Sequence, residues 1–257
     1  VVQPLPVSGI DNSGGADGPP VVFLLGFGGA AMQWRGLQTS ISFKARTLAF
    51  DLPGHGEAVD FEGAGPVGLA AKAVLATMDD QDISSAHLVG HSMGGAVASL
   101  AAVMKPEKVA SLTLLAPGGY GTEFNHPLLM EWAKARTEDE LRAVLPQFFG
   151  PTFAVSEKIV AFQQHLRSRP RAVEMLTSIA TGMSSDGQQG VLPVSDILGL
   201  PMPKTVLWGT DDNVLPVSQL EQFARHAATS RLEGVGHSPA EEATDQVKAA
   251  IFAQLDA

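Results

Sequence analysis

LVGHSMGG, residues Leu88–Gly95, places one serine between glycines at the end of an apolar run. Ser92 is the centre of a G-x-S-x-G pattern, with Gly90 two residues before it and Gly94 two residues after it. A sharp turn from a strand into a helix exposes such a serine, and it leaves room only for small residues at these two positions. The pattern therefore predicts a nucleophilic Ser92 between a strand and a helix.

The sequence on both sides of this turn predicts an α/β fold. Apolar runs that end in glycines or turn residues are typical of strands buried on both faces, and they lie at residues 21–26, 46–51, 85–90, 109–119 and 204–209. Helical spacing covers residues 67–80, and the Ala-rich stretch after Ser92 has no helix breaker before Pro106. Two more helices are expected at 217–227 and 239–255, around a short strand near Arg231. This alternation predicts a mostly parallel, doubly wound sheet with helices on both faces.

Residues 122–196 differ from this pattern, because the strand signal vanishes and apolar residues recur at helical spacing. Thr137 and Glu140 form a capping-box pair at the start of one helix. We therefore expect residues 1–121 and 197–257 to form the core and residues 122–196 to form an inserted helical cap. Residues 1–20, rich in Pro and Gly, predict an irregular or weakly stranded entry.

Composition excludes several classes of protein. With 45% hydrophobic and 17% charged residues the chain forms a packed globule. A net charge of −10 repels a phosphate backbone, so we expect no nucleic-acid partner. No apolar run approaches the roughly 20 residues that span a bilayer, so we expect no membrane association. There are no cysteines, which excludes disulfides and thiolate metal sites and suits the cytoplasmic location that we expect. Composition does not indicate the oligomeric state.

A serine nucleophile needs a base and an acid that orients it. Among seven histidines, His237 follows the last short strand and precedes the terminal helix, at the expected end of the sheet. For the acid, Asp211 and Asp212 both follow the strand 204–209, and we favour Asp212. The chain order Ser92, Asp212, His237 is the one expected for a triad on a doubly wound sheet.

The other candidates have structural explanations. His91 adjoins the nucleophile, so its side chain points elsewhere and fills a packing role. His55 lies in a turn and holds it, and Asp51 is a weaker, structural rival to Asp212. For the oxyanion, we expect the backbone N–H of Met93, at the start of the helix, and that of Phe27, in the loop after the first long strand.

Five ordered motifs, LLGFGG, DLPGHG, GHSMGG, WGTDDNVLP and GVGHS, together resemble the α/β-hydrolase superfamily from about residue 21 onward. The resemblance implies a serine, acid and histidine triad under a helical cap, with no metal or organic cofactor. A narrower set, at residues 112–125, 140–150 and 186–189, resembles the hydrolase-like domain of the dihydrolipoamide acetyltransferase subunit of acetoin dehydrogenase complexes. In that subunit a lipoyl domain comes first. These 257 residues contain no lipoyl segment, so the domain either stands alone or follows a segment before Val1.

Three functions are consistent with these residues. The first is a serine hydrolase that cleaves a small ester or thioester through a Ser92 acyl-enzyme, with His237 as base and Asp212 as acid. The second is an acyltransferase that moves a short acyl group between dihydrolipoamide and CoA, with a thiol acceptor in place of water. The third, an inert binding module, is disfavoured because no triad member is missing. As substrate-pocket candidates we name Gly28, Tyr120, Phe149 and Trp132, although apolar cap residues also serve simply to pack the cap.

Overall fold

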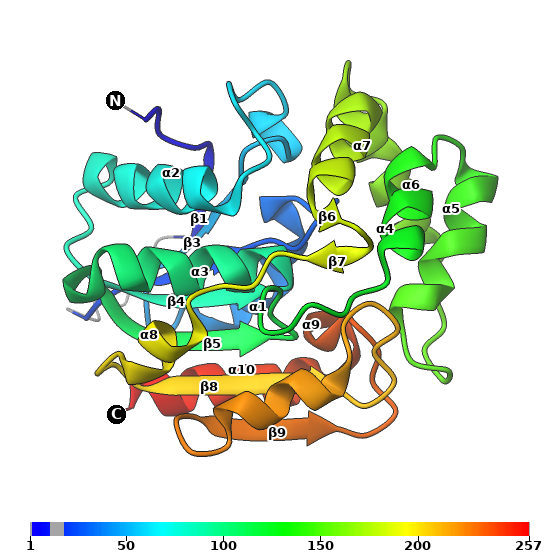
Figure 1. The fold of residues 1–257 in the computed structure, drawn as a ribbon. Coiled ribbons are helices and arrows are strands. Elements are labelled where there is room, and N and C mark those ends of the chain that lie inside the picture. The colour runs from blue at the N-terminus through cyan, green and yellow to red at the C-terminus, as the bar shows by residue number, and fades with distance from the viewer. Residues whose placement is uncertain (1, 11–17, 257) are drawn as a thin grey trace.

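Seven strands form one sheet at the centre of the molecule (Figure 1). The computed structural model describes residues 2–10 and 18–256, so residues 11–17 of the expected irregular entry lie outside the described residues. The strands follow the order β1-β3-β2-β4-β5-β8-β9 across the sheet. Their bounds are β1 Val7–Ile10, β2 Val21–Leu24, β3 Thr47–Phe50, β4 Ala86–His91, β5 Val109–Leu115, β8 Lys204–Gly209 and β9 Ala228–Leu232.

All neighbouring pairs in the sheet are parallel except β1 and β3, which run antiparallel. Every residue of β2, β3 and β8 is buried, as strands covered on both faces require. Parallel strands share their carboxyl ends at one edge, and that edge is where ligands bind in such sheets. Ser92 follows β4 at this edge, and Asp212 follows β8 there.

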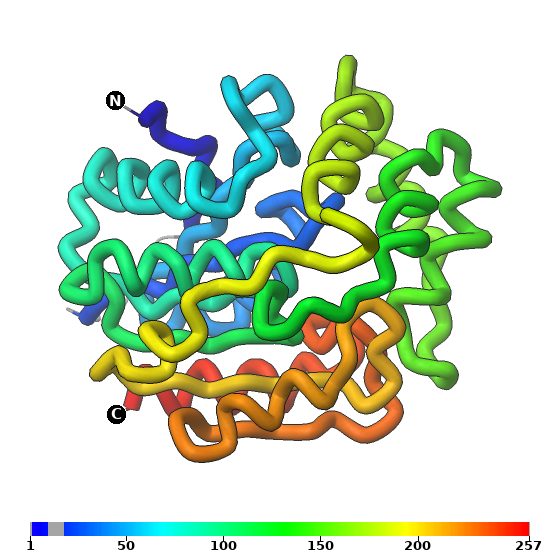
Figure 2. Tube along the Cα trace, viewed as in Figure 1, coloured from blue at the N-terminus to red at the C-terminus, as the bar shows by residue number. Residues whose placement is uncertain are grey.

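Helices cover both faces of the sheet, as Figure 2 also shows along the chain trace. On one face α1 (Arg35–Ile41) and α10 (Thr244–Leu255) pack against each other and against the sheet. The other face carries α2 (Val67–Asp80), α3 (Met93–Met104) and α8 (Val194–Gly199). The α/β-hydrolase fold expected from the sequence is thereby confirmed. Short 3-10 helices lie at Ala31–Trp34, Gly56–Ala58 and Pro106–Lys108.

Between β5 and β8 the chain forms a group of helices beside the carboxyl edge of the sheet, at the right of Figure 1. These are α4 (His126–Lys134), α5 (Glu138–Val144), a 3-10 helix at Leu145–Phe148, α6 (Glu157–Arg167) and α7 (Ala172–Gly182). The predicted capping box opens α5: the Glu140 backbone N–H donates to Thr137 Oγ1 at 3.2 Å, and Glu140 Oε2 accepts from the Thr137 N–H at 2.9 Å.

Three elements differ from the sequence-based prediction. The segment that we expected to be wholly helical contains a hairpin, β6 (Ser184–Ser185) and β7 (Gln188–Gln189). Its turn residues Asp186 and Gly187 both have positive φ, at 52° and 79°, which matches a two-residue hairpin turn. Two-residue strands are too short to show an alternating pattern, so the sequence signal was absent.

The other two differences concern helix type and continuity. The helix predicted over 217–227 is a 3-10 helix that ends earlier, at Val217–Phe223. The predicted last helix is divided into α9 (Pro239–Glu242) and α10, because Ala243 has an extended φ of −131°. Ala243 is buried in the same apolar cluster as Val247 and Ile251 of α10.

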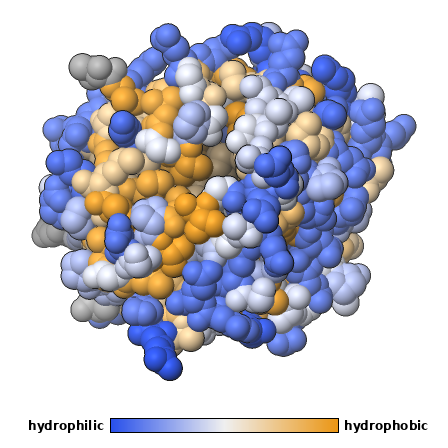
Figure 3. Space-filling view, in the orientation of Figure 1, coloured by the Kyte–Doolittle hydropathy of each residue, from blue (hydrophilic) through white to orange (hydrophobic). Residues whose placement is uncertain are grey.

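The surface is apolar in places. Figure 3 shows apolar side chains gathered on the face that carries α2, α3 and α8, and this face is hollowed near its centre. Among the described residues, no helix combines the length and the apolar character needed to cross a membrane.

Candidate active site

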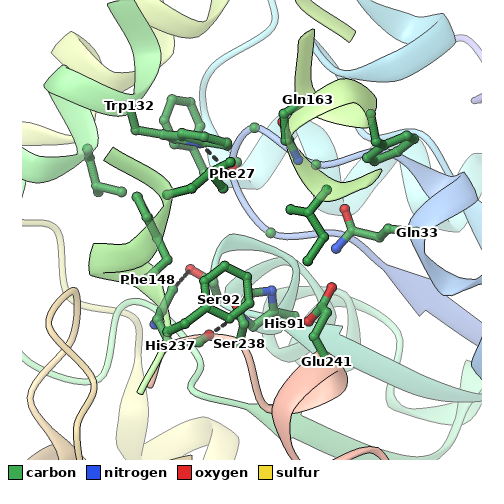
Figure 4. Close-up of a pocket in the computed structure, with 18 of the residues that line it drawn as sticks. Phe27, Gln33, His91, Ser92, Trp132, Phe148, Gln163, His237, Ser238 and Glu241 are labelled. Atoms are coloured by element: carbon green, nitrogen blue, oxygen red, sulfur yellow. Dashed lines mark hydrogen bonds between the residues drawn. The ribbon is translucent and has the colours of Figure 1, made fainter. Parts of the chain in front are cut away.

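Ser92, His237 and Asp212 form a continuous chain of hydrogen bonds at the carboxyl edge of the sheet. Figure 4 shows Ser92 and His237 where they line a cavity. His237 Nε2 lies 2.9 Å from Ser92 Oγ, and His237 Nδ1 lies 2.8 Å from Asp212 Oδ2. Because a carboxylate only accepts, Nδ1 carries the ring proton and Nε2 is free to accept the proton of the serine hydroxyl. The geometry is that of a nucleophile, a base and an orienting acid.

Both side-chain oxygens of Asp212 accept hydrogen bonds from the surrounding protein. Oδ1 accepts from the backbone N–H groups of Val214 at 2.8 Å and Leu215 at 2.9 Å. Oδ2 accepts from the Trp208 indole N–H at 3.1 Å as well as from His237. The side chain of Asp212 is fully buried, so these bonds fix its orientation. Asp211 is exposed and makes no such contact with His237.

Ser92 lies in a strained turn between β4 and α3. Its φ of 51° and ψ of −117° fall in a region that residues with a side chain rarely adopt. A Cβ on Gly90 would overlap the Gly94 carbonyl, and one on Gly94 would overlap the Leu24 carbonyl. The two glycines of the motif are therefore required by close backbone approach, which lets the turn place the Ser92 hydroxyl outside the sheet.

His91 supports the histidine rather than competing with it. Burial lowers the pKa of His91 to about 3, so its ring is neutral. His91 Nε2–H donates to the carbonyl oxygen of His237 at 2.6 Å, and the backbone N–H of His237 donates to the Phe148 carbonyl at 2.8 Å. The backbone of His237 is thus held on both sides, and His91 has a positioning contact in addition to its packing.

Two other residues that we assigned structural roles make structural contacts. His55 is buried, burial lowers its pKa to about 4, and its Nδ1–H donates to the Pro53 carbonyl at 3.1 Å within its own turn. Asp51 accepts from the backbone N–H groups of Ala31 and Glu57, at 2.7 and 3.1 Å. Asp51 therefore ties the loop after β2 to the turn after β3.

The loop after β2 carries Phe27 beside Ser92. The Gly29 N–H donates to the Gly26 carbonyl at 3.0 Å, and Gly28 has a φ of 78°, so the loop turns tightly. The Trp132 indole N–H from α4 approaches the Phe27 carbonyl at 3.4 Å. A Cβ on Gly28 would overlap this indole, so the glycine is needed for α4 to reach the loop.

Trp132 is in turn held by a buried guanidinium. The Arg167 guanidinium carbon lies 3.9 Å from the centre of the Trp132 ring, and the group donates to the carbonyls of Trp132 and Ala135, both at 3.0 Å. It also donates to Gln163 Oε1 at 2.7 Å. Burial lowers the pKa of Arg167 to about 10, so it stays charged at neutral pH. Arg167 therefore satisfies the C-terminal carbonyls of α4.

Two cavities meet at Ser92. The first cavity, of about 350 Å³, is lined by the triad residues Ser92 and His237 and, among others, by Gly28, Gln33, Trp132, Phe148, Phe149, Lys158 and Glu241. The second cavity, of about 470 Å³, is lined by Ser92, Met93 and, among others, Gly119, Phe124, Ile179, Met183, Leu192 and Leu215. Phe27 and Leu129 line both. His237 borders only the first cavity, Met93 borders only the second, and the second has no charged residue on its lining.

The structure brings most of the predicted site residues, but not all of them, to the cavities or to the hydrogen-bonded chain. Ser92, Asp212 and His237 are brought together, and Gly28, Phe149 and Trp132 line the first cavity. Tyr120 lies elsewhere: its side chain is fully buried, its hydroxyl is 2.7 Å from Ser99 Oγ, and it lines neither cavity. The aromatic ring packs on Phe223 in the core, which explains why a pocket position was wrong for this residue.

Sequence reasoning missed several residues that shape this site. Trp208 lies on β8, four residues before Asp212, but nothing in the sequence shows that its indole faces the carboxylate. Glu242 accepts from the backbone N–H groups of Gly150 and Gly236 and so fixes the loop that carries His237. Glu241, Gln33 and Lys158 reach the first cavity from three separate elements. Among these residues, only Glu241 and Glu242 formed a visible sequence pattern, as two consecutive glutamates shortly after GVGHS.

The comparisons with known proteins agree with this fold. The sequence profile described as "Alpha/beta hydrolase family" matches residues 21–250. The chain belongs to the alpha/beta hydrolase family. This confirms the resemblance drawn from the motifs, and the chain is an α/β-hydrolase-type enzyme.

Named relatives of this α/β-hydrolase fall into two groups. It is 32% identical over 242 residues to the "dihydrolipoyllysine-residue acetyltransferase component of acetoin cleaving system" of Pseudomonas putida, covering 94% of this chain and 65% of the relative. It is 28% identical over 222 residues to a 2-hydroxy-6-oxononadienedioate/2-hydroxy-6-oxononatrienedioate hydrolase of a Pseudomonas species, covering 80% of this chain and 76% of the relative. The chain thus spans just under two thirds of the length of the acetoin-system relative.

Solved structures support the fold. A meta-cleavage product hydrolase from Pseudomonas fluorescens IP01 superposes with a TM-score of 0.85 at 21% identity, over 97% of this chain and 93% of that chain. At this identity the likeness concerns the fold alone.

Proposed function

We propose that the chain is a serine hydrolase that cleaves a carboxylic ester or thioester through an acyl-enzyme on Ser92. The observation that carries the proposal is the hydrogen-bonded chain from Ser92 Oγ through the His237 ring to the buried Asp212 carboxylate. A serine hydroxyl becomes a nucleophile when a neighbouring base removes its proton, and a buried acid stabilises the cation that forms on that base.

In the first step Ser92 Oγ attacks the carbonyl carbon, and His237 Nε2 takes the hydroxyl proton. Asp212 holds the Nδ1–H of the resulting imidazolium. The carbonyl oxygen becomes negative, and the backbone N–H groups of Phe27 and Met93 donate to it; one such donor contributes about 3 kcal/mol to the transition state. His237 then protonates the departing alcohol or thiol. Water repeats the attack on the acyl-serine and releases the acid.

The two cavities support an assignment of the two halves of the substrate. The leaving group receives its proton from His237, and His237 borders only the first cavity. The acyl group then occupies the second cavity, whose lining carries no charged residue and is mostly apolar. We propose an apolar acyl group of modest size there. Residues 122–196 serve as a cap, because α4 lines both cavities, α6 lines the first and α7 lines the second.

A second function, acyl transfer to a thiol, is favoured by one observation. The relative from Pseudomonas putida is named as the acetyltransferase component of an acetoin cleaving system. In this reading a dihydrolipoamide or CoA thiol enters the first cavity and takes the acyl group from Ser92 in place of water. The protein would then act within a multienzyme complex. The two functions share the acyl-enzyme and differ in the acceptor.

A fluorophosphonate probe tests the acyl-enzyme directly. We expect labelling at a single residue and its loss in Ser92→Ala, and Ser195→Ala on α8 serves as the exposed serine control. The kcat of Ser92→Ala or His237→Ala should fall by roughly 10⁶-fold, as in other triads that act as a unit. Labelling that persists in Ser92→Ala would remove Ser92 from the role of nucleophile.

A substrate panel separates hydrolysis from transfer. Short-chain esters, acyl-CoA and acyl-dihydrolipoamide are each supplied with and without added dihydrolipoamide or CoA, and released acid and acylated thiol are both quantified. A hydrolase yields acid at a rate that the added thiol does not change. An acyltransferase yields acylated thiol at the expense of acid.

A further inference from the structure

Glu241 faces the first cavity from the short segment that follows His237. It lies on α9, and in Figure 4 its carboxyl group points into the cavity towards the Gln33 carboxamide. The mechanism proposed above does not use this side chain. Its location places a carboxylate on the wall of the cavity that we assign to the leaving group or acceptor.

Within the part of the chain that the structure describes, the Glu241 carboxylate has no ion-pair partner. Among the described residues, no Lys, Arg or His forms an ion pair with Glu241. The neighbouring Glu242 is different, because its carboxylate accepts from the backbone N–H groups of Gly150 and Gly236. The charged groups that act on Glu241 are Glu242, which repels its ionised form, and His237, which favours it.

The surroundings of the Glu241 carboxyl group oppose its ionisation. Glu241 as a whole residue is exposed, but the protein packed around its carboxyl group raises the pKa of that group to about 7. His91 is neutral, so it supplies no compensating charge. The ionised form, which these surroundings disfavour, gains stability from a ligand that brings a positive charge.

The remaining lining suits a cation as well. Aromatic rings of the first cavity come from five residues, Phe27, Trp132, Phe148, Phe149 and Phe162. Aromatic faces attract alkylammonium groups. Lys158 on α6 is also on the lining, but it is exposed and is not among the charges that act on Glu241.

We propose that Glu241 binds a cationic alkylammonium group on the leaving-group or acceptor portion of the substrate. The inference rests on the proposed function, because it assigns the first cavity to that portion. Glu241 is then a specificity-determining residue: it favours cationic over neutral leaving groups and disfavours anionic ones. Gln33, on the opposite side of the cavity, orients the same portion without adding charge.

Three acetate esters that differ in leaving-group charge test this inference. Acetylcholine carries a quaternary ammonium, 3,3-dimethylbutyl acetate is its neutral isostere, and 4-acetoxybutanoate carries a carboxylate. We expect kcat/KM for the cationic ester to exceed that for the neutral isostere by about tenfold, mainly through KM. In Glu241→Gln this ratio should fall towards one. The control Glu62→Gln removes the same charge from an exposed position outside the cavities and should leave the ratio unchanged.

The pH dependence gives an independent readout. The ratio of the two kcat/KM values cancels any pH dependence that the two esters share, because both react with the same Ser92 and His237. We expect the ratio to rise as pH increases through about 7, where Glu241 ionises, and to be flat in Glu241→Gln. A ratio near one in the wild type, or a preference for 4-acetoxybutanoate, would overturn the inference and would point to Lys158 as the charge that the substrate meets.

Failure of this inference and failure of the proposed function are distinguishable. If the fluorophosphonate labels Ser92 but all three esters react alike, the acyl-enzyme stands and the role of Glu241 falls. If Ser92 is not labelled, calorimetric titration with choline and with 3,3-dimethylbutanol still tests Glu241. Binding of choline that is weakened by Glu241→Gln supports the site, and equal binding of both compounds overturns it.

Discussion

At the scale of single residues, the chemistry depends on which of two adjacent aspartates faces His237. Asp212 turns inward because the backbone N–H groups of Val214 and Leu215 and the Trp208 indole all donate to it. Asp211 is exposed, and its backbone N–H donates to the Val235 carbonyl. The two adjacent side chains point in different directions, and only that of Asp212 faces His237.

Replacing the two aspartates in turn tests this assignment. In Asp212→Asn the carboxamide no longer stabilises the imidazolium and favours the wrong tautomer, so kcat should fall by about 10⁴-fold. Asp211→Asn changes an exposed side chain and serves as the matched control, with kcat close to that of the wild type. Steady-state kinetics on one ester checks both variants. A larger loss in Asp211→Asn than in Asp212→Asn would show that the acid was assigned to the wrong residue.

The sequence predicts the location of a site residue when that residue directly follows a predicted strand. Ser92 and His237 each follow a strand, and parallel strands bring their carboxyl ends together, so spacing alone placed both at one edge. Contacts between residues that are far apart in the sequence cannot be predicted from the order of strands and helices. Glu241 and Gln33 meet at one cavity from elements about two hundred residues apart, and Tyr120 was misplaced because its neighbour Ser99 lies on another element.

At the scale of elements, directed contacts join the helical segment to the core and join its helices to one another. Trp132 reaches the Phe27 carbonyl, and Arg167 lies across the Trp132 ring while satisfying the carbonyls at the end of α4. Long, periodic helices and buried strands were predictable because their patterns repeat. The hairpin β6–β7 was not, because it is short and polar and depends on pairing rather than on a repeated pattern.

Removing the Arg167 guanidinium should weaken the packing of α6 against α4. Arg167→Met keeps much of the side-chain length but leaves the Trp132 and Ala135 carbonyls without their donors, and the free energy of unfolding should fall by about 3 kcal/mol. Arg171→Met is the control, because Arg171 forms an exposed ion pair with Asp60, and such pairs contribute about 1 kcal/mol or less. Urea unfolding measures both variants. Equal losses would show that the buried guanidinium is not a special support.

At the scale of the whole molecule, buried neutral histidines couple folding to pH. Burial lowers the pKa values of His55 and His91 to about 4 and about 3, from 6.5. Between these values and 6.5 the unfolded chain binds more protons than the folded one, so stability rises with pH and is lost on acidification. The raised pKa of Glu241 acts in the opposite direction over part of the same range.

Substituting one buried histidine isolates its contribution to the stability that is lost at acidic pH. Between pH 7 and pH 5 each buried histidine should remove about 2 kcal/mol from the free energy of unfolding. His55→Gln lacks one titrating group, so its stability should fall less than that of the wild type by about this amount. Urea unfolding at the two pH values provides the comparison. If His55→Gln loses as much stability as the wild type, His55 does not remain neutral in the folded chain.

Because the two cavities meet at the Ser92 hydroxyl group, substrate selectivity can change separately for the two halves of the substrate. The linings share Ser92, Phe27 and Leu129 and otherwise come from different residues. Under the proposed function, a substitution at Met183 or Leu192 is expected to change the preferred acyl chain without altering the ranking of leaving groups, and a substitution at Glu241 is expected to do the reverse. Preferences for the two halves of a substrate become separable traits, which lets a single scaffold acquire a new acceptor while it retains its acyl donor.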